Sequence, residues 1–199
     1  MNSLEYFFLD LGLSWTYSKL IPYVLAILFG AGFSWFLLVK IKKQSWLKFS
    51  SVIGSFVLPF IIYFTFFPIY EGDFSNMGVR SNSTIPFPQK KTLTVVVLPN
   101  CPFCYQSIRL MKKLKERKPE ITIQYWISTS DTLSRDTKIF KVIPDYFTTF
   151  QKYNKAEISK LVQDTYPCFI LSKEGKSLKL WNNNHFGVSA LDEIERFFN

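Results

Sequence analysis

Two long runs without a charged residue constrain this chain most. The first covers residues 20–39 and the second covers residues 49–70, so they are 20 and 22 residues long. As helices, runs of this length can cross a hydrocarbon layer of roughly 30 Å. Because the chain is 48% hydrophobic and its apolar residues gather in this way, it is not a simple soluble globule. We predict a two-helix transmembrane hairpin followed by one α/β domain.

The distribution of basic residues predicts the orientation of this hairpin. The segment between the runs, residues 40–48, contains four lysines and no acidic residue: Lys40, Lys42, Lys43 and Lys48. The tail of residues 1–19 and the segment that follows Tyr70 are poor in lysine and arginine. Since basic loops stay in the cytoplasm, residues 40–48 should be cytoplasmic. Both termini and the soluble domain should then be extracytoplasmic, which in a bacterium is the periplasmic side of the inner membrane.

The N-terminal tail, residues 1–19, has no basic start and no small-residue cleavage pattern after the apolar run, so we expect the first run to remain as an anchor. The tail carries an apolar cluster that could lie along the membrane surface or extend the first helix, and the sequence leaves both open. No ionisable residue falls within residues 20–39 or 49–70, which favours a simple anchor over a transport path.

Residues 71–89 are rich in Gly, Ser, Asn and Pro and show neither strand nor helix periodicity, so we predict a flexible tether. Within it, Asn82-Ser83-Thr84 matches the acceptor triplet for N-glycosylation, which would matter in a eukaryotic lumen.

Residues 90–199 have the length and patterning of one soluble α/β domain. Strands are predicted at 92–98, 121–127, 168–172 and 177–181, and helices at 105–118, 147–162 and from a cap at Ser189 onward. The order is βαβ and then αββα, which predicts a mixed sheet with a parallel pair and an antiparallel hairpin.

The formal net charge of +9 is spread along the chain, and many of the basic residues lie on the predicted helix 105–118. A solvated helix face explains them, and an approach to anionic lipid or an acidic partner is the alternative. A nucleic-acid partner is disfavoured because the domain is predicted to be extracytoplasmic.

The chemistry of the chain is concentrated in its three cysteines. The motif Cys101-Pro102-Phe103-Cys104 stands where a predicted buried strand ends and a helix begins. A thiol at a helix start faces unpaired N–H groups and the positive end of the helix dipole, which stabilise the reactive thiolate. Pro102 suits the first helical turn, where no N–H is needed. The pair could also form a permanent structural disulfide.

Three motifs between residues 92 and 198 give the domain a resemblance to the thioredoxin superfamily. They are Cys101-Pro102-Phe103-Cys104 after a strand, Tyr166-Pro167 before a strand, and Phe186-Gly187-Val188 before the last helix. The Cys-Pro-x-Cys form is closest to that of glutaredoxins and periplasmic disulfide oxidoreductases. The resemblance implies a thioredoxin-like fold and no cofactor.

The same resemblance implies roles for individual residues. Cys101 would be the nucleophile and Cys104 the resolving thiol that releases a mixed disulfide. Pro167 would be cis and face the two cysteines, and the backbone at Tyr166 and Pro167 would hold an extended substrate by β-type hydrogen bonds. Gly187 would lie in the adjoining substrate groove.

Cys168 directly follows the expected cis-proline, so it should lie near the other two thiols. An inert buried thiol on a core strand explains it. A zinc site made of Cys101, Cys104, Cys168 and the only histidine, His185, is the alternative.

Two functions follow from the sequence. The favoured one is a membrane-tethered thiol-disulfide oxidoreductase that acts on extracytoplasmic proteins through Cys101 and Cys104, with a membrane redox partner that contacts the two helices. The alternative is a non-catalytic thioredoxin-like subunit of a larger membrane complex.

Overall fold

The computed structural model describes residues 1–40, 46–80, 85–129, 137–152 and 155–199. The chain divides into two compact units, Met1–Tyr70 and Glu71–Asn199. Two features from the sequence lie outside the described residues: the glycosylation triplet Asn82-Ser83-Thr84 and the lysines Lys42 and Lys43.

The first unit is helical. Its elements are α1 (Ser3–Asp10), α2 (Trp15–Lys40) and α3 (Trp46–Phe66). Both α2 and residues 49–66 of α3 are long and apolar enough to cross a membrane. The tail forms a separate helix, because Gly12 adopts a positive φ of 92° between α1 and α2. Of the two possibilities left open for the tail, a continuous extension of the first long helix is therefore wrong.

Small and polar side chains bring α2 and α3 together. Gly30 lies directly against the backbone of Phe56, where a side chain would collide. The hydroxyl of Ser34 donates to the carbonyl oxygen of Val52 at 2.9 Å and lies 2.9 Å from the hydroxyl oxygen of Ser55. Such contacts are typical of helix pairs in lipid, where close backbone approach and hydrogen bonds replace the hydrophobic effect.

The second unit is built on a five-stranded sheet. Its strands are β1 (Thr92–Val97), β2 (Ile123–Ser128), β3 (Thr148–Lys152), β4 (Cys168–Lys173) and β5 (Lys176–Asn182). The spatial order is β3-β2-β1-β4-β5. The pairs β1–β2 and β2–β3 are parallel, and the pairs β1–β4 and β4–β5 are antiparallel. The mixed sheet predicted from the sequence is confirmed.

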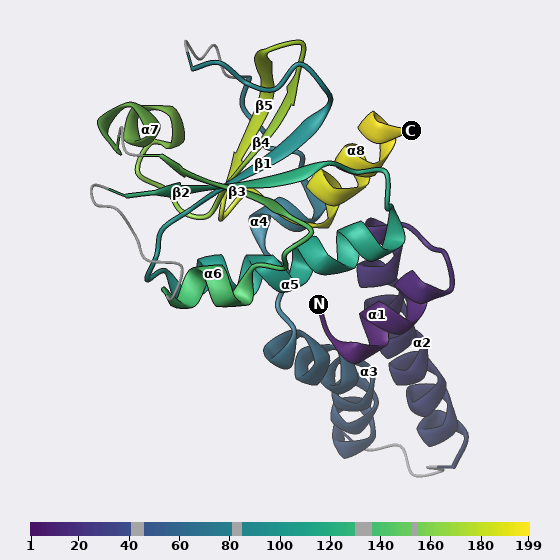
Figure 1. Ribbon diagram of the computed structural model, residues 1–199. Helices are drawn as coiled ribbons and strands as arrows, with labels where there is room; N and C mark the ends of the chain where they lie inside the picture. The colour runs from purple at the N-terminus through teal and green to yellow at the C-terminus, as the bar shows by residue number, and fades with distance from the viewer. Residues whose placement is uncertain (41–45, 81–84, 130–136, 153–154) are drawn as a thin grey trace. The chain divides into compact units, whose positions relative to one another are not determined.

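The helices of the second unit cover both faces of this sheet. They are α4 (Glu71–Phe74), α5 (Pro102–Arg117), α6 (Lys138–Val142), α7 (Lys155–Val162) and α8 (Val188–Phe198). On one face Val96, Trp126 and Cys168 lie side by side on three strands and pack with Ile158 and Val162 of α7. Helices α5 and α8 lie on the other side of the sheet (Figure 1). The strand β1 runs between these layers, and all six of its residues are buried.

One predicted helix is wrong in its first half. The range 147–162 was expected to be helical, but residues 148–152 form β3 and only residues 155–162 form α7. The β-branched Thr148 and Thr149 suit a strand, and pairing with β2 overrides the local helical periodicity. The short α6 was not predicted either. The observed order is therefore βαβαβαββα rather than βαβ followed by αββα.

The expected flexible tether, residues 71–89, is wrong for its described residues. Val79 forms a two-way backbone bridge with Leu180 at the edge of the sheet. Further along, the ring of Phe87 stacks on Trp126 with 5.1 Å between ring centroids. The segment carries few apolar residues, but these fill the cluster on the α7 face, and their burial orders the backbone around them.

The last helix starts earlier than its predicted cap. Gly187 is the N-cap of α8. Ser189 is the second residue of the helix, so its hydroxyl is not the cap. The inner face of this helix includes Leu191 and Ile194, which are fully buried.

Candidate functional site

The start of α5 positions the first cysteine. Cys101 is the N-cap residue, with φ −96° and ψ 114°, and its Sγ accepts a hydrogen bond from the N–H of Cys104 at 3.2 Å. Pro102 occupies the first helical position, where its missing N–H costs nothing. A sulfur held in this way lies at the positive end of the helix dipole, which stabilises a thiolate on Cys101 when the pair is reduced.

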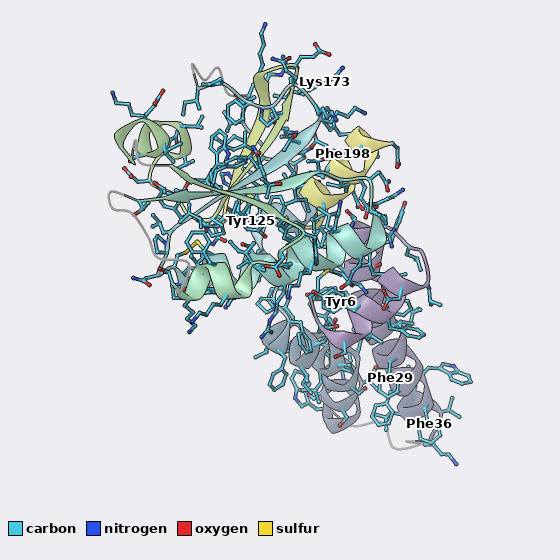
Figure 2. All side chains as sticks on the ribbon, viewed as in Figure 1. Tyr6, Phe29, Phe36, Tyr125, Lys173 and Phe198 are labelled. Atoms are coloured by element: carbon cyan, nitrogen blue, oxygen red, sulfur yellow. A yellow bond between two sulfur atoms is a disulfide. The ribbon has the colours of Figure 1, made fainter. Side chains whose placement is uncertain are left out.

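Cys101 and Cys104 are joined in a disulfide, with 5.2 Å between their Cα atoms (the yellow bond in Figure 2). Cys104 is completely buried, whereas Cys101 is partly exposed. Of the two residues, only Cys101 offers exposed surface to an incoming thiol or disulfide. This asymmetry matches the nucleophile and resolving roles that the resemblance implied, which remain predictions.

A cis peptide bond lies beside the disulfide. The bond between Tyr166 and Pro167 is cis, as expected from the sequence. Because β4 pairs antiparallel with β1, in the register Val96 with Cys168, the residues before β4 meet the loop that follows β1. The carbonyl oxygen of Tyr166 lies 4.0 Å from the Sγ of Cys101. The backbone at this bond is thus close to the sulfur of Cys101.

The third cysteine occupies a different environment. Cys168 is fully buried among apolar residues of β1, β2, β4 and α7, and none of the described members of this cluster belongs to α5. Burial raises the pKa of its thiol to about 12. Although the sequence places Cys168 next to Pro167, its side chain points into the α7 face of the sheet, where burial favours the protonated thiol at neutral pH.

The zinc alternative finds no support in the described residues. Within residues 1–40, 46–80, 85–129, 137–152 and 155–199, no group of three or more His, Cys, Asp or Glu side chains is placed to hold a metal ion. His185 lies in the turn after β5, where its backbone N–H donates to the side-chain oxygen of Asn182 at 2.9 Å. The alternation of side chains along β4 turns Cys168 into the apolar cluster, which separates it from the disulfide pair.

Gly187 contacts the chain's own backbone. A side chain at this position would collide with the carbonyl of Gly72 and the nitrogen of Asp73. Glycine is needed here because α4 approaches so closely, and α4 packs against α8. The resemblance implied a position for Gly187 in the substrate groove; that role stays a prediction, and the segment that lies against Gly187 was expected to be a tether.

Two side chains near the motif were missed by the sequence analysis. The hydroxyl of Tyr105 donates to the carbonyl oxygen of Pro99 at 2.7 Å, and the ammonium nitrogen of Lys138 lies 5.4 Å from the centre of the Tyr105 ring. Tyr105 could have been noticed as the residue after Cys104, but nothing in the sequence places Lys138, which is on α6, beside it. Phe103 within the motif is 57% exposed and leaves an apolar surface next to Cys101.

No protein-family model matches this chain, and no curated protein matches it. Solved structures do show similarity. The thioredoxin domain of a thiol-disulfide oxidoreductase from Bacteroides vulgatus is 18% identical, with a TM-score of 0.42 over 56% of this chain and 81% of that one.

Two further structures lie in the same range of similarity. A secreted disulfide oxidoreductase from Mycobacterium tuberculosis is 16% identical, with a TM-score of 0.41 over 55% of this chain and 82% of that one. The apo Sco1 protein from Thermus thermophilus is 13% identical, with a TM-score of 0.43 over 62% of this chain and 97% of that one.

The domain itself carries the features on which the resemblance rested. A parallel β1–α5–β2 unit, an antiparallel β4–β5 hairpin and a closing helix α8 surround a disulfide at the start of α5. The cis bond before β4 faces that disulfide. Residues 71–199 therefore form a thioredoxin-like α/β domain.

Proposed function

We propose that this chain is a membrane-anchored thiol-disulfide oxidoreductase that exchanges disulfides with extracytoplasmic proteins through Cys101 and Cys104. The observation that carries the proposal is the asymmetry of the pair. Cys101 is partly exposed, and its sulfur caps a helix and accepts a backbone N–H, whereas Cys104 is fully buried. A permanent structural disulfide needs neither the helix cap nor an accessible sulfur.

The chemistry proceeds in two exchanges. In the oxidised state, a substrate thiolate attacks the Sγ of Cys101, the Cys101–Cys104 bond breaks, and Cys104 leaves as a thiolate that takes up a proton. A second substrate thiolate then attacks the substrate sulfur of the mixed disulfide and displaces Cys101. The substrate gains a disulfide and the protein gains two electrons and two protons, and the reverse sequence reduces a substrate disulfide.

The cis bond provides the docking position in this proposal. The carbonyl of Tyr166 lies next to the Sγ of Cys101, so an extended substrate strand can bond to this backbone while its cysteine meets the sulfur. Phe103, exposed beside Cys101, adds an apolar contact for the side chains that flank the substrate cysteine. Gly187 is left out because α4 lies against it.

The helices α2 and α3 serve as the membrane anchor in this proposal. Their surfaces are strongly apolar where they are exposed, as at Phe29 with 70% and Trp35 with 69% of the side chain accessible. Such large exposed aromatic residues are costly in water and suit lipid. The lysines between the helices support a location of the domain outside the cytoplasm, where disulfides persist. A membrane redox partner that returns the pair to its working oxidation state would contact these helices.

Trapping of mixed disulfides tests the reaction. In Cys104→Ala the nucleophile remains but the resolving thiol is gone, so adducts with substrate proteins should accumulate in membranes as higher-mass bands that a reducing agent removes. Cys101→Ala should form none, and Cys168→Ala, which keeps the pair intact, should behave as the natural protein. If Cys104→Ala reaches normal levels in the membrane and traps nothing, the chain is not an oxidoreductase, and the accessory-subunit alternative takes its place.

Topology is tested separately with a membrane-impermeant maleimide on intact cells after mild reduction. Cys101 should be labelled from outside without permeabilisation. Labelling only after the membrane is opened would place the domain in the cytoplasm and contradict the proposed location. Release of the protein from membranes at alkaline pH would contradict the anchor.

A further inference from the structure

The loop that carries the reactive cysteine is held by a side chain from the helix that follows it. This loop runs from the end of β1 at Val97 to the N-cap at Cys101. Within it, the carbonyl oxygen of Pro99 accepts the hydroxyl of Tyr105 at 2.7 Å, and the bond is partly buried. Pro99 has no N–H of its own, so this carbonyl is its one backbone group for hydrogen bonding.

Tyr105 holds this loop through two hydrogen bonds. Its backbone N–H donates to the carbonyl of Cys101 at 3.3 Å, and its hydroxyl reaches back to Pro99. The ring is itself held, because the ammonium group of Lys138 lies over it at 5.4 Å from the ring centre. Pro99, which lies two residues before the nucleophile, and Cys101 itself thus both accept a hydrogen bond from Tyr105.

The position of Cys101 matters because its sulfur accepts the N–H of Cys104 only in the N-cap conformation. The helix fixes the C-terminal side of Cys101 through backbone bonds. On the N-terminal side, Asn100 is exposed and the bond from Tyr105 to Pro99 restrains the chain. Loss of that bond would let Asn100 and Cys101 sample conformations in which the sulfur leaves the N–H groups, and the thiolate would lose part of its stabilisation.

We propose that Tyr105 is a positioning residue for the disulfide exchange, which holds Cys101 at the helix N-terminus through its hydrogen bond to Pro99. The proposal rests on the proposed function of Cys101. Tyr105 touches neither the reacting sulfurs nor a substrate in this role, and its effect is transmitted through the loop.

The test uses the full chain in detergent with Cys104→Ala, so that Cys101 is the accessible thiol, and follows its alkylation by iodoacetamide as a function of pH. Tyr105→Phe keeps the ring and its contact with Lys138 but removes the hydroxyl. We expect the midpoint of alkylation to move to higher pH, with about two- to tenfold less thiolate below the midpoint, as the loss of one hydrogen bond predicts.

Tyr125→Phe is the matched control, because the hydroxyl of Tyr125 is buried and has no hydrogen-bond partner among the described residues (Tyr125 is labelled in Figure 2). Its removal should leave the midpoint unchanged. Lys138→Met measures how much the charge of Lys138 contributes to the midpoint of alkylation. A shift caused by the lost charge should shrink as salt is added, whereas the shift in Tyr105→Phe should persist at high salt.

Three outcomes overturn the proposal: an unchanged midpoint in Tyr105→Phe, an equal shift in Tyr125→Phe, or a Tyr105→Phe shift that disappears at high salt. If Cys104→Ala still traps substrate adducts in any of these cases, the proposed function stands and only the role of Tyr105 fails. If adducts are absent with Tyr105 intact, the proposed function fails first. Melting of each variant followed by circular dichroism shows whether a shift comes from unfolding, and Tyr105→Leu, which also lacks a donor, replaces Tyr105→Phe if the latter does not fold.

Discussion

The start of α5 and the start of β4 each carry a cysteine, and the two are opposite in chemical character. Cys101 is partly exposed, caps a helix and accepts a backbone N–H at 3.2 Å. Cys168 is fully buried on a central strand, and burial raises the pKa of its thiol to about 12. The residue before Cys168, Pro167, belongs to the cis bond that faces Cys101.

This comparison shows that closeness to a reactive site does not make a thiol reactive. The deciding factor is the direction in which the backbone turns the side chain. The side chain of Cys168 points into apolar residues, whereas the backbone carbonyl of Tyr166, two residues earlier, lies 4.0 Å from the Sγ of Cys101. Unpaired N–H groups at a helix start stabilise a thiolate, and an apolar cluster removes the water that would stabilise one.

The largest expected difference between the two cysteines is their rate of alkylation. After mild reduction at pH 7, Cys101 should react with iodoacetamide within minutes. Cys168 should stay unmodified, because a pKa of about 12 leaves only about one thiolate in 10⁵ at that pH. Mass mapping of the peptides before and after unfolding in urea measures both. Rapid modification of Cys168 in the folded protein would show that the cluster opens and would remove the contrast.

The next largest effect is a pH dependence of the free energy of unfolding, caused by the ionisation of Cys168. The folded state raises the pKa of this thiol, so the unfolded chain loses its proton first. The contribution to stability is complete below pH ~8.5, where both states are protonated, and declines as pH rises toward about 12. Each unit of pKa difference corresponds to about 1.4 kcal/mol.

Unfolding of the oxidised protein in urea at several pH values above 8 measures this decline, with Cys168→Ala as the reference that lacks the group. The free energy of unfolding should fall more steeply with pH for the natural protein. Parallel curves for the two proteins would mean that Cys168 titrates normally in the fold.

The smallest effect in this series is the replacement of the buried sulfur by oxygen. Cys168→Ser places a polar hydroxyl in the apolar cluster beside Val96 and Ile170 and should lower the free energy of unfolding by about 1–3 kcal/mol. Cys168→Ala should cost less, although alanine is the smaller residue. Trapping by Cys104→Ala should be unaffected in either background. A Cys168→Ser protein as stable as the natural one would place water or a polar group beside this position.

Much of this arrangement was accessible from local patterns. The β-branched run at residues 92–98 predicted β1, and a Cys-Pro-x-Cys motif after it predicted a helix start with a disulfide. The prolyl bond at Pro167 is cis as the resemblance implied. These features depend on a few adjacent residues whose conformations are restricted by chemistry, which is why a single sequence suffices for them.

Other elements depended on partners distant in sequence. Residues 148–152 became β3 because the edge of β2 was available to pair with them. The segment predicted as a tether was ordered by the burial of Phe87 against Trp126 and by the bridge between Val79 and Leu180. No local pattern predicts such pairing, since the energy comes from surfaces that only the folded chain brings together.

The sequence by itself determined that this protein has two apolar helices and an α/β domain with a cysteine pair at a helix start, because composition, periodicity and proline positions act locally. Only the tertiary structure decided that Cys168 stays protonated at neutral pH, that Gly187 lies against Gly72, and that Tyr105 reaches Pro99. The physical reason is the same in each case. Burial, close backbone approach and a hydrogen bond depend on which atoms surround a group, and those atoms come from other parts of the folded domain.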